Sequence, residues 1–148
     1  MSKKVLLINP NYLKVYKYLM SESTTMVEAP IGLAYIAGML RHHGIDVQIL
    51  DLAGLNMDDE HAKEEVRRRK PDLVGIGAAT NTLLEAFNIA KFVKEIDSSI
   101  MVVLGGPHTS VYPARTLEEC KDIDVCVMQE AEYTFLEIAQ EKPLSKVL

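Results

Sequence analysis

Two glycines and a histidine directly follow an apolar run in the C-terminal part of the sequence. The motif is Gly105-Gly106-Pro107-His108-Thr109-Ser110, after the run Met101–Leu104. Glycine has no side chain, so this pair would let a ligand approach the backbone closely, or would simply form a tight turn between a strand and a helix. Neutral imidazole binds transition metals well. We nevertheless expect His108 to form a hydrogen bond to a ligand or to a neighbouring loop.

Polar and small residues also follow the other apolar runs. Asn9-Pro10 follows Val5–Ile8, Thr80-Asn81-Thr82 follows Leu73–Ala78, and Glu130 and Glu132 follow Asp124–Met128. A carboxyl group acts as a general acid only where it reaches the proton and has a suitable pKa. For these two glutamates we expect contacts with ligand amides or the N-capping of a helix, and we assign no catalytic residue.

The sequence lacks the residues that several other kinds of binding or catalytic site require. A phosphoacceptor receiver requires paired acids after the first strand, and a flavin phosphate loop requires glycines and hydroxyls there. The sequence Gly75–Thr80 is an incomplete dinucleotide fingerprint, and no P-loop, GxSxG or HExxH motif occurs. The spacing of Cys120 and Cys126 does not match that of a zinc, iron-sulfur or redox motif. The sequence therefore predicts no metal ligands.

The composition restricts the class of protein. A chain of 148 residues is long enough for one domain. A net charge of -5 disfavours nucleic acid as a partner, because binding a phosphate backbone relies on clustered Lys and Arg. The apolar run Val5–Ile8 is too short for a signal peptide or a membrane span. We expect a cytoplasmic domain that contacts neither membrane nor nucleic acid.

Short apolar runs alternate with segments of helical period, which is typical of βα units around a buried parallel sheet. We predict an α/β, doubly wound, flavodoxin-like three-layer sandwich with a five-stranded parallel sheet of order 2-1-3-4-5. The expected strands are Val5–Ile8, Val47–Leu50, Leu73–Ala78, Met101–Leu104 and Asp124–Met128. The expected helices are Ile31–His43, Asp58–Arg69, Leu83–Ile96, Pro113–Cys120 and Thr134–Gln140.

Residues at the ends of these segments match known terminal signals. Gly44 favours a left-handed helix C-terminus, and Asp58 is a candidate N-cap. Thr82 and Glu85 have the spacing of a capping box. The stretch from Pro10 to Pro30 is too long for an ordinary connection. We therefore expect a functional loop at the carboxyl edge of the sheet, where open α/β sheets bind ligands.

Six sequence blocks, taken in order, resemble the N-terminal cobalamin-binding domain of the B12-binding radical SAM family. They are Val5–Pro10, Ala29–Ala37, Asp51, Pro71–Ile76, Val102–His108 and Glu130–Phe135. The last block resembles the GEGE-type turn of the family, although Gln129 and Ala131 replace its glycines. A side chain at position 129 or 131 would narrow the crevice or give the turn another geometry.

The resemblance implies cobalamin as the cofactor, with the corrin over the carboxyl edge and the nucleotide tail beside the third and fourth strands. The DxHxxG motif, which supplies a histidine to cobalt, is absent after the first strand; Asp59-Glu60-His61 continues to Glu64 instead of glycine. The expected cofactor-binding residues are Asn9, Pro10, Pro30, Gly32, Leu33, Thr80, Asn81, Thr82, Gly105, Gly106, Pro107, His108, Thr109, Glu130 and Glu132.

The same resemblance implies a larger enzyme. The sequence has no CxxxCxxC motif, so the [4Fe–4S] cluster and S-adenosylmethionine would belong to a downstream radical SAM domain. We expect residues 1–140 to form the cobalamin-binding domain and residues 141–148 to begin a linker, in a chain that is not catalytic alone. The full enzyme would be a methyltransferase or a cyclase of the magnesium-protoporphyrin type. The alternatives are a degenerate interaction or regulatory domain without cofactor and a flavodoxin-like redox or nucleotide-binding protein.

Overall fold

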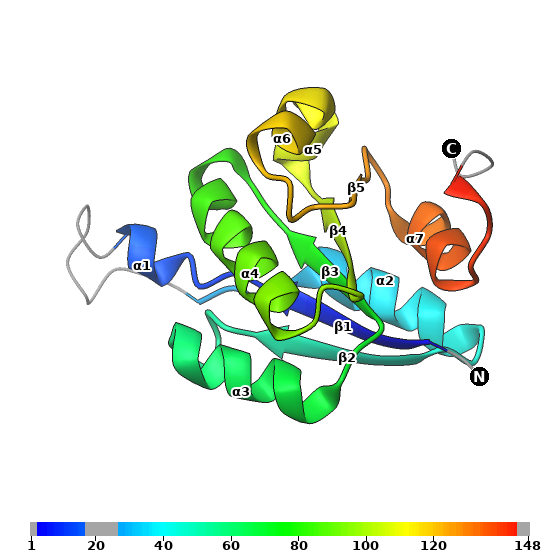
Figure 1. Cartoon of the computed structure of the whole chain (residues 1–148), viewed down its shortest axis with the longest axis horizontal. Helices are drawn as coiled ribbons and strands as arrows, with labels where there is room; N and C mark the ends of the chain where they lie inside the picture. The colour runs from blue at the N-terminus through cyan, green and yellow to red at the C-terminus, as the bar shows by residue number, and fades with distance from the viewer. Residues whose placement is uncertain (1–2, 17–26, 145–148) are drawn as a thin grey trace.

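Five parallel strands form one sheet in the order β2-β1-β3-β4-β5, which confirms the predicted topology (Figure 1). The computed structural model describes residues 3–16 and 27–144. The strands are β1 (Lys4–Asn9), β2 (Asp46–Asp51), β3 (Leu73–Gly77), β4 (Met101–Gly105) and β5 (Val125–Cys126). β5 has two residues instead of the expected five. Among the described residues it pairs only with β4, and edge strands are often short.

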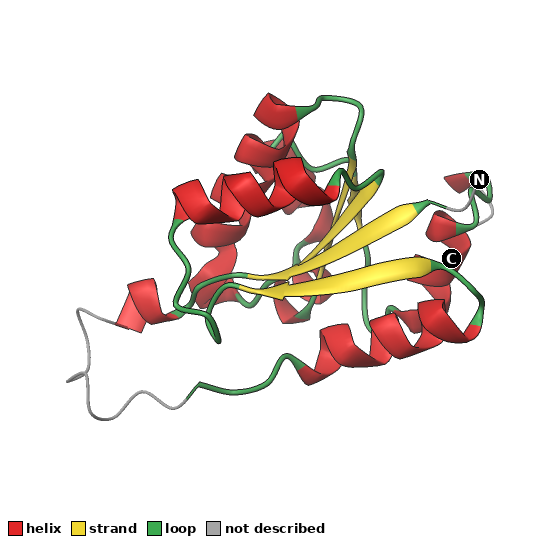
Figure 2. Ribbon diagram, turned by 90° about the horizontal axis from the view of Figure 1, so that it is seen from below, coloured by secondary structure: helices red, strands yellow, loops and turns green. Residues whose placement is uncertain are grey.

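Helices cover both faces of this sheet (Figure 2). They are α1 (Leu13–Tyr16), α2 (Ile31–His42), α3 (Asp59–Arg69), α4 (Leu83–Ile96), α5 (Pro107–Val111), α6 (Pro113–Glu119) and α7 (Glu132–Ala139). The short helices α1 and α5 were not predicted. A 3₁₀ turn, Thr80–Thr82, also precedes α4. No described helix is long and apolar enough to cross a membrane.

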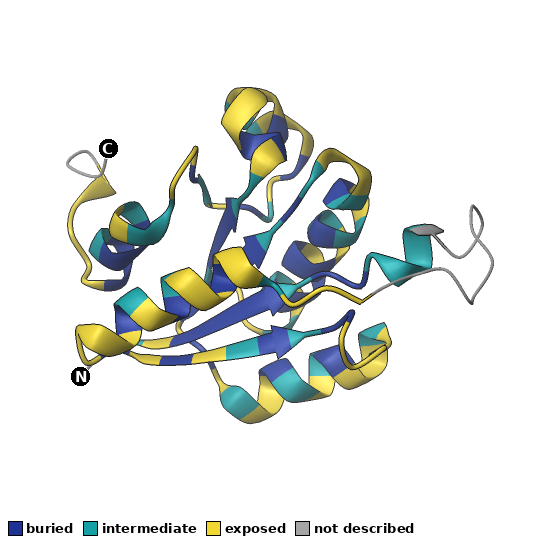
Figure 3. Ribbon diagram, turned by 180° about the vertical axis from the view of Figure 1, so that it is seen from behind, coloured by how far each residue is buried: buried dark blue, intermediate teal, exposed yellow. Residues whose placement is uncertain are grey.

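The two faces of the sheet have separate hydrophobic cores. Successive strand side chains point to opposite faces, so Leu6 and Ile8 of β1 pack under α3 and α4, whereas Val5 and Leu7 pack under α2 and α7. Figure 3 shows the central strands β1, β3 and β4 largely buried, whereas β2 at the edge alternates between exposed and buried residues. Burying one such aliphatic side chain contributes about 1.5–3 kcal/mol. Both layers of helices are therefore held on the sheet by apolar packing.

Two of the predicted helix ends are confirmed. Gly44 follows α2 with a φ of +74°, and its N–H donates to the carbonyl of Arg41 at 3.0 Å. Asp58 caps α3 by accepting a hydrogen bond from the N–H of His61 at 2.9 Å. These interactions satisfy backbone groups that the helix itself leaves unpaired.

The predicted capping box at α4 is wrong. The Thr82 hydroxyl accepts from the N–H of Ala79 at 3.1 Å and lies 3.2 Å from the carbonyl of the same residue, so it stabilises the 3₁₀ turn. Glu85 forms an ion pair with Lys14 instead of reaching back to the helix start. Thr82 therefore occupies the N-cap position of α4 without a side-chain capping hydrogen bond.

Parts of two predicted segments lie outside the described residues. Residues 17–26 belong to the long stretch after β1, and residues 145–148 belong to the expected linker. The described ends of the long stretch are Pro10–Tyr16 and Val27–Pro30. The structure therefore describes this stretch only where it joins β1 and α2.

We expect acid to destabilise the domain partly through Glu65 of α3. Arg68 and Arg69 lie 2.6 and 2.7 Å from its carboxylate and lower its pKa from 4.5 to about 2. Because the folded-state pKa is the lower one, this stabilisation is complete above about pH 4.5 and is lost as the pH falls towards 2. Since the pair is solvent-accessible, Glu65→Gln should cost only about 1 kcal/mol at pH 7. Urea unfolding at pH 7 and pH 3 should show that the free energy of unfolding falls less between these pH values for Glu65→Gln than for the wild type.

Candidate functional site

Three glycines leave open space on the sheet face that lies under α2 and α7. Gly75 and Gly77 of β3 and Gly105 of β4 share this face with Leu7 and Val103, because side chains alternate along each strand. Gly77 pairs with Gly105 in the sheet register. A Cβ atom on Gly105 would have no neighbour within 4 Å. A cavity of about 720 Å³ occupies this space, within the usual size range of small-molecule sites.

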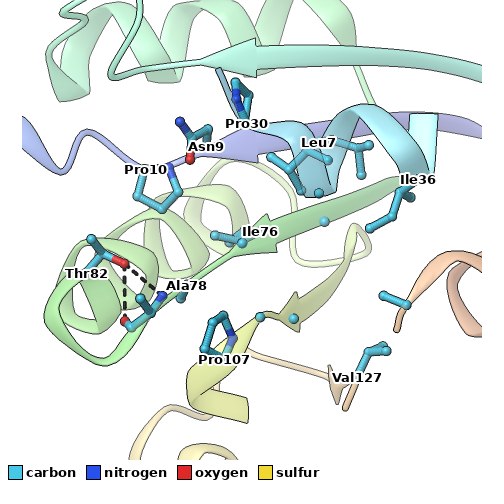
Figure 4. Close-up of a pocket in the computed structure, with 18 of the residues that line it drawn as sticks. Leu7, Asn9, Pro10, Pro30, Ile36, Ile76, Ala78, Thr82, Pro107 and Val127 are labelled. Carbon is cyan, nitrogen blue, oxygen red and sulfur yellow. Dashed lines mark hydrogen bonds between the residues drawn. The ribbon is translucent and has the colours of Figure 1, made fainter. Parts of the chain in front are cut away.

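Twelve of the fifteen predicted binding residues line this cavity (Figure 4). They come from the last residues of β1 and β4, from the segments that follow β1, β3, β4 and β5, and from the start of α2. They are Asn9, Pro10, Pro30, Gly32, Leu33, Asn81, Thr82, Gly105, Gly106, Pro107, Glu130 and Glu132. The structure therefore brings together residues that lie more than 100 positions apart in the sequence.

The other three predicted residues, Thr80, His108 and Thr109, do not line the cavity. His108 is 8% exposed, and its Nδ1 lies 3.0 Å from the Thr80 hydroxyl. The buried Thr109 hydroxyl lies 2.7 Å from the carbonyl of Val127, to which it donates a hydrogen bond. All three side chains thus connect the loops that form the wall.

Sequence reasoning missed the inner part of the cavity. The residues concerned include Leu7, Ile36, Gly75, Val103, Val127 and Phe135, together with Tyr12 and Glu28 at the mouth. The apolar members look like ordinary core residues in the sequence. The available signal was the glycine pair 75 and 77, whose spacing of two places both residues on one sheet face.

Asn9 presents a fixed polar group at the mouth. Its Nδ2 donates to Asp51 Oδ1 at 2.8 Å, and the same oxygen accepts from the N–H of Gly54 at 3.0 Å. This arrangement uses the amide nitrogen of Asn9 and leaves its oxygen as an acceptor. Asp51, one of the six blocks of the resemblance, therefore acts through Asn9.

The long segment after β1 is held at both described ends. Tyr12 Oη accepts from the N–H of Glu28 at 2.8 Å, which joins the start and the end of the segment beside the cavity. Lys14 of α1 forms ion pairs with Asp59 at 2.6 Å and Glu85 at 3.2 Å. These contacts tie the segment to α3 and α4.

Two residues with positive φ shape the loops after β4 and β5. Gly106 has a φ of +115°, and a Cβ there would lie 2.5 Å from the carbonyl oxygen of Ala78. Gln129 has a φ of +56° and donates its N–H to the Ser110 hydroxyl at 2.8 Å. The loop after β5 thus keeps a left-handed conformation that glycine adopts more easily, and Gln129 is one of the residues that line the cavity.

Acidic groups give the cavity its charge. Glu28, Glu130 and Glu132 line it, and none of the described lining residues is Lys, Arg or His. Such a mouth suits a ligand that presents N–H donors rather than a group of phosphates. His61 lies elsewhere, on α3, where Asp58 accepts its hydrogen bond at 2.8 Å and raises the pKa of its imidazole. Within residues 3–16 and 27–144, no three His, Cys, Asp or Glu side chains gather as a metal site.

These features define a doubly wound α/β domain with a small-molecule site at the carboxyl ends of its strands. The family model for the B12 binding domain matches residues 20–139. The chain therefore belongs to the B12-binding domain family.

Curated relatives support the same assignment. The chain is 38% identical over 109 residues to "Uncharacterized methyltransferase PH0819" of Pyrococcus horikoshii, a match that covers 74% of this chain and 24% of the relative. It is 34% identical over 111 residues to the anaerobic magnesium-protoporphyrin IX monomethyl ester cyclase of Rubrivivax gelatinosus, covering 74% of this chain and 20% of the relative. The matches thus span about a quarter or less of these relatives.

Solved structures share the fold. The radical S-adenosylmethionine methyltransferase TsrM from Kitasatospora setae, with cobalamin and a [4Fe-4S] cluster bound, matches 99% of this chain over 26% of its own, with a TM-score of 0.79 and 23% identity. OxsB with aqua-cobalamin and S-adenosylmethionine matches with a TM-score of 0.75 and 18% identity, covering 99% of this chain and 19% of OxsB. The predicted resemblance to cobalamin-dependent radical SAM enzymes is confirmed, and the cofactor-free interaction domain is not favoured.

Proposed function

We propose that this domain binds cobalamin, with the nucleotide tail in the cavity under α2 and α7 and the corrin over its mouth. The observation that carries the proposal is an open cavity of about 720 Å³, floored by Gly77 and Gly105, in a B12-binding domain. Glycines at these positions let a ligand lie against the strand backbone. Without them, β3 and β4 would project side chains into the same space.

The mouth suits the edge of a corrin ring. The side chains of the corrin end in carboxamides, whose N–H groups need acceptors. Glu28, Glu130, Glu132 and the Asn9 amide oxygen supply acceptors there. Bound cobalamin would supply a cobalt centre able to carry a methyl group. The residues of this domain would bind and orient that cofactor.

We further propose that the domain serves a radical SAM methyltransferase or cyclase. Two of its curated relatives are a methyltransferase and a cyclase, of which the matches span 24% and 20%. A further domain would hold the [4Fe–4S] cluster and S-adenosylmethionine, as the radical SAM partner of this one. Ile31, Leu84, Met128 and Tyr133 are more than half exposed and adjoin residues at or near the mouth, so such a domain would cover them. The boundary between residues 1–140 and 141–148 and the cytoplasmic location remain predictions.

The test is a titration of the purified chain with hydroxocobalamin, followed by the corrin absorption bands and by equilibrium dialysis. We expect saturable binding of one cobalamin per chain. A parallel titration with flavin mononucleotide should show no binding, because residues 9–13 at the end of the first strand lack the glycines and the serine or threonine hydroxyls that surround a flavin phosphate. Absence of saturable cobalamin binding would contradict the proposal, and flavin binding would favour the redox alternative.

A further inference from the structure

The inner end of the cavity is formed by one row of residues across three strands. Leu7 pairs with Gly75, and Gly75 pairs with Val103. Leu7 and Val103 are at most 1% exposed. Val127 and Phe135, each 3% exposed, line the cavity on the side of β5 and α7. We call these five residues the inner wall.

The inner wall has no polar side chain. The polar lining residues lie at the strand ends or in the loops that follow, for example Asn9, Thr82 and Glu130. β3 is paired on both sides, with β1 and β4, so the sheet already uses its backbone hydrogen-bonding groups. A polar ligand atom at the inner wall would lose its water without gaining a partner.

Gly75 and Phe135 set the depth of the cavity. A Cβ on Gly75 would lie 2.7 Å from Phe135 Cε2 and 2.8 Å from Leu7 Cδ2. The Phe135 ring can therefore lie directly against β3 only because residue 75 is glycine. Aromatic rings form favourable contacts with other planar groups. The cavity therefore ends at an apolar surface to which the Phe135 ring contributes.

We propose that this inner wall selects among corrinoids by the base at the end of the nucleotide tail. The inference rests on the proposed function and goes one step beyond it. Corrinoids share the corrin ring and differ in this base. Dimethylbenzimidazole presents an apolar edge with two methyl groups, whereas adenine presents an amino group and further ring nitrogens. The inner wall accepts the first base and disfavours the second.

The experiment compares three ligands by equilibrium dialysis: hydroxocobalamin, the corrinoid with adenine in place of dimethylbenzimidazole, and cobinamide, which lacks the nucleotide tail. We expect the adenine compound to bind roughly 5-fold or more weakly than cobalamin, the cost of an unsatisfied buried polar group. Cobinamide should also bind more weakly, because it leaves the cavity empty.

Phe135→Leu tests the role of the inner wall directly. The shorter side chain opens space in which water can hydrogen-bond to adenine, so the ratio of the two dissociation constants should fall at least about 3-fold. Phe92→Leu is the matched control, because Phe92 is 2% exposed in the core under α3 and α4 and does not line the cavity. It should leave the ratio unchanged. The wild type and the variants are compared by the same ratio of dissociation constants, so any difference in how readily the two bases dissociate from cobalt cancels.

The outcomes separate this inference from the proposed function. Equal binding of cobalamin and cobinamide, or a ratio that Phe135→Leu does not change, overturns the inference while cobalamin binding stands. If none of the three corrinoids binds, the proposed function itself fails.

Discussion

Gly105→Leu should weaken the binding of hydroxocobalamin about 50-fold or more while the domain stays folded. A Cβ at this position meets no atom within 4 Å, so the leucine side chain would extend into the cavity instead of displacing the core. Losing about 100 Å² of apolar contact with the ligand costs about 2.5 kcal/mol. Equilibrium dialysis measures the loss, and the thermal midpoint checks the fold.

Gly38→Leu provides the matched control for this substitution. Gly38 lies on the exposed side of α2, has nothing within 4 Å of its Cβ position and does not line the cavity. This variant should bind hydroxocobalamin like the wild type. Unchanged binding by Gly105→Leu would show that the tail does not enter the cavity.

Gly106→Ala should destabilise the domain by about 3 kcal/mol, although it adds only one methyl group. The backbone has a φ of +115°, which strains any residue with a side chain. The new methyl would also lie 2.5 Å from the carbonyl oxygen of Ala78 and 3.0 Å from its nitrogen. Both atoms belong to the backbone and cannot move aside cheaply. We expect the thermal midpoint to fall by about 10 °C in calorimetry.

The neighbouring glycine is the control for this prediction. Gly105→Ala makes the same chemical change one residue earlier, with open space around the new methyl. It should change the free energy of unfolding by less than about 1 kcal/mol. Equal effects of the two alanine variants would mean that the close approach of Gly106 to Ala78 contributes nothing to stability.

The strands were predictable because a sheet buried on both faces needs continuous apolar runs. Val5–Ile8 and Met101–Leu104 fall within β1 and β4. The regular βα alternation and the right-handed crossover rule favoured the observed sheet order, which the sequence does not itself specify. The capping box at Thr82 failed for a local reason. A 3₁₀ turn and then α4 begin near this residue, and the Thr82 hydroxyl forms its hydrogen bond with the backbone at the start of the 3₁₀ turn.

Part of the candidate site was predictable because its residues end or follow a strand, as Asn9, Gly105 and Glu130 do, and the carboxyl edge of a parallel sheet gathers such residues. The family resemblance indicated Pro30, Gly32 and Leu33 at the start of α2. Phe135 and Val103 could not be distinguished from core residues, because the same apolar side chains fill a core and line a cavity. His108 follows a strand too, but it makes its hydrogen bond to Thr80 within the wall.

The separation of the two cores gives the faces of the sheet different freedom to accept substitutions. Leu7, Leu33, Val103, Val127 and Phe135 belong to the core under α2 and α7 and also line the cavity. Changing their volume alters folding and ligand recognition together. Ile89 and Phe92, in the core under α3 and α4, do not line the cavity. Ile76 and Ala78 of this core do line the cavity, but its other residues can be substituted for greater heat resistance, or can vary neutrally, without changing which cofactor the domain selects.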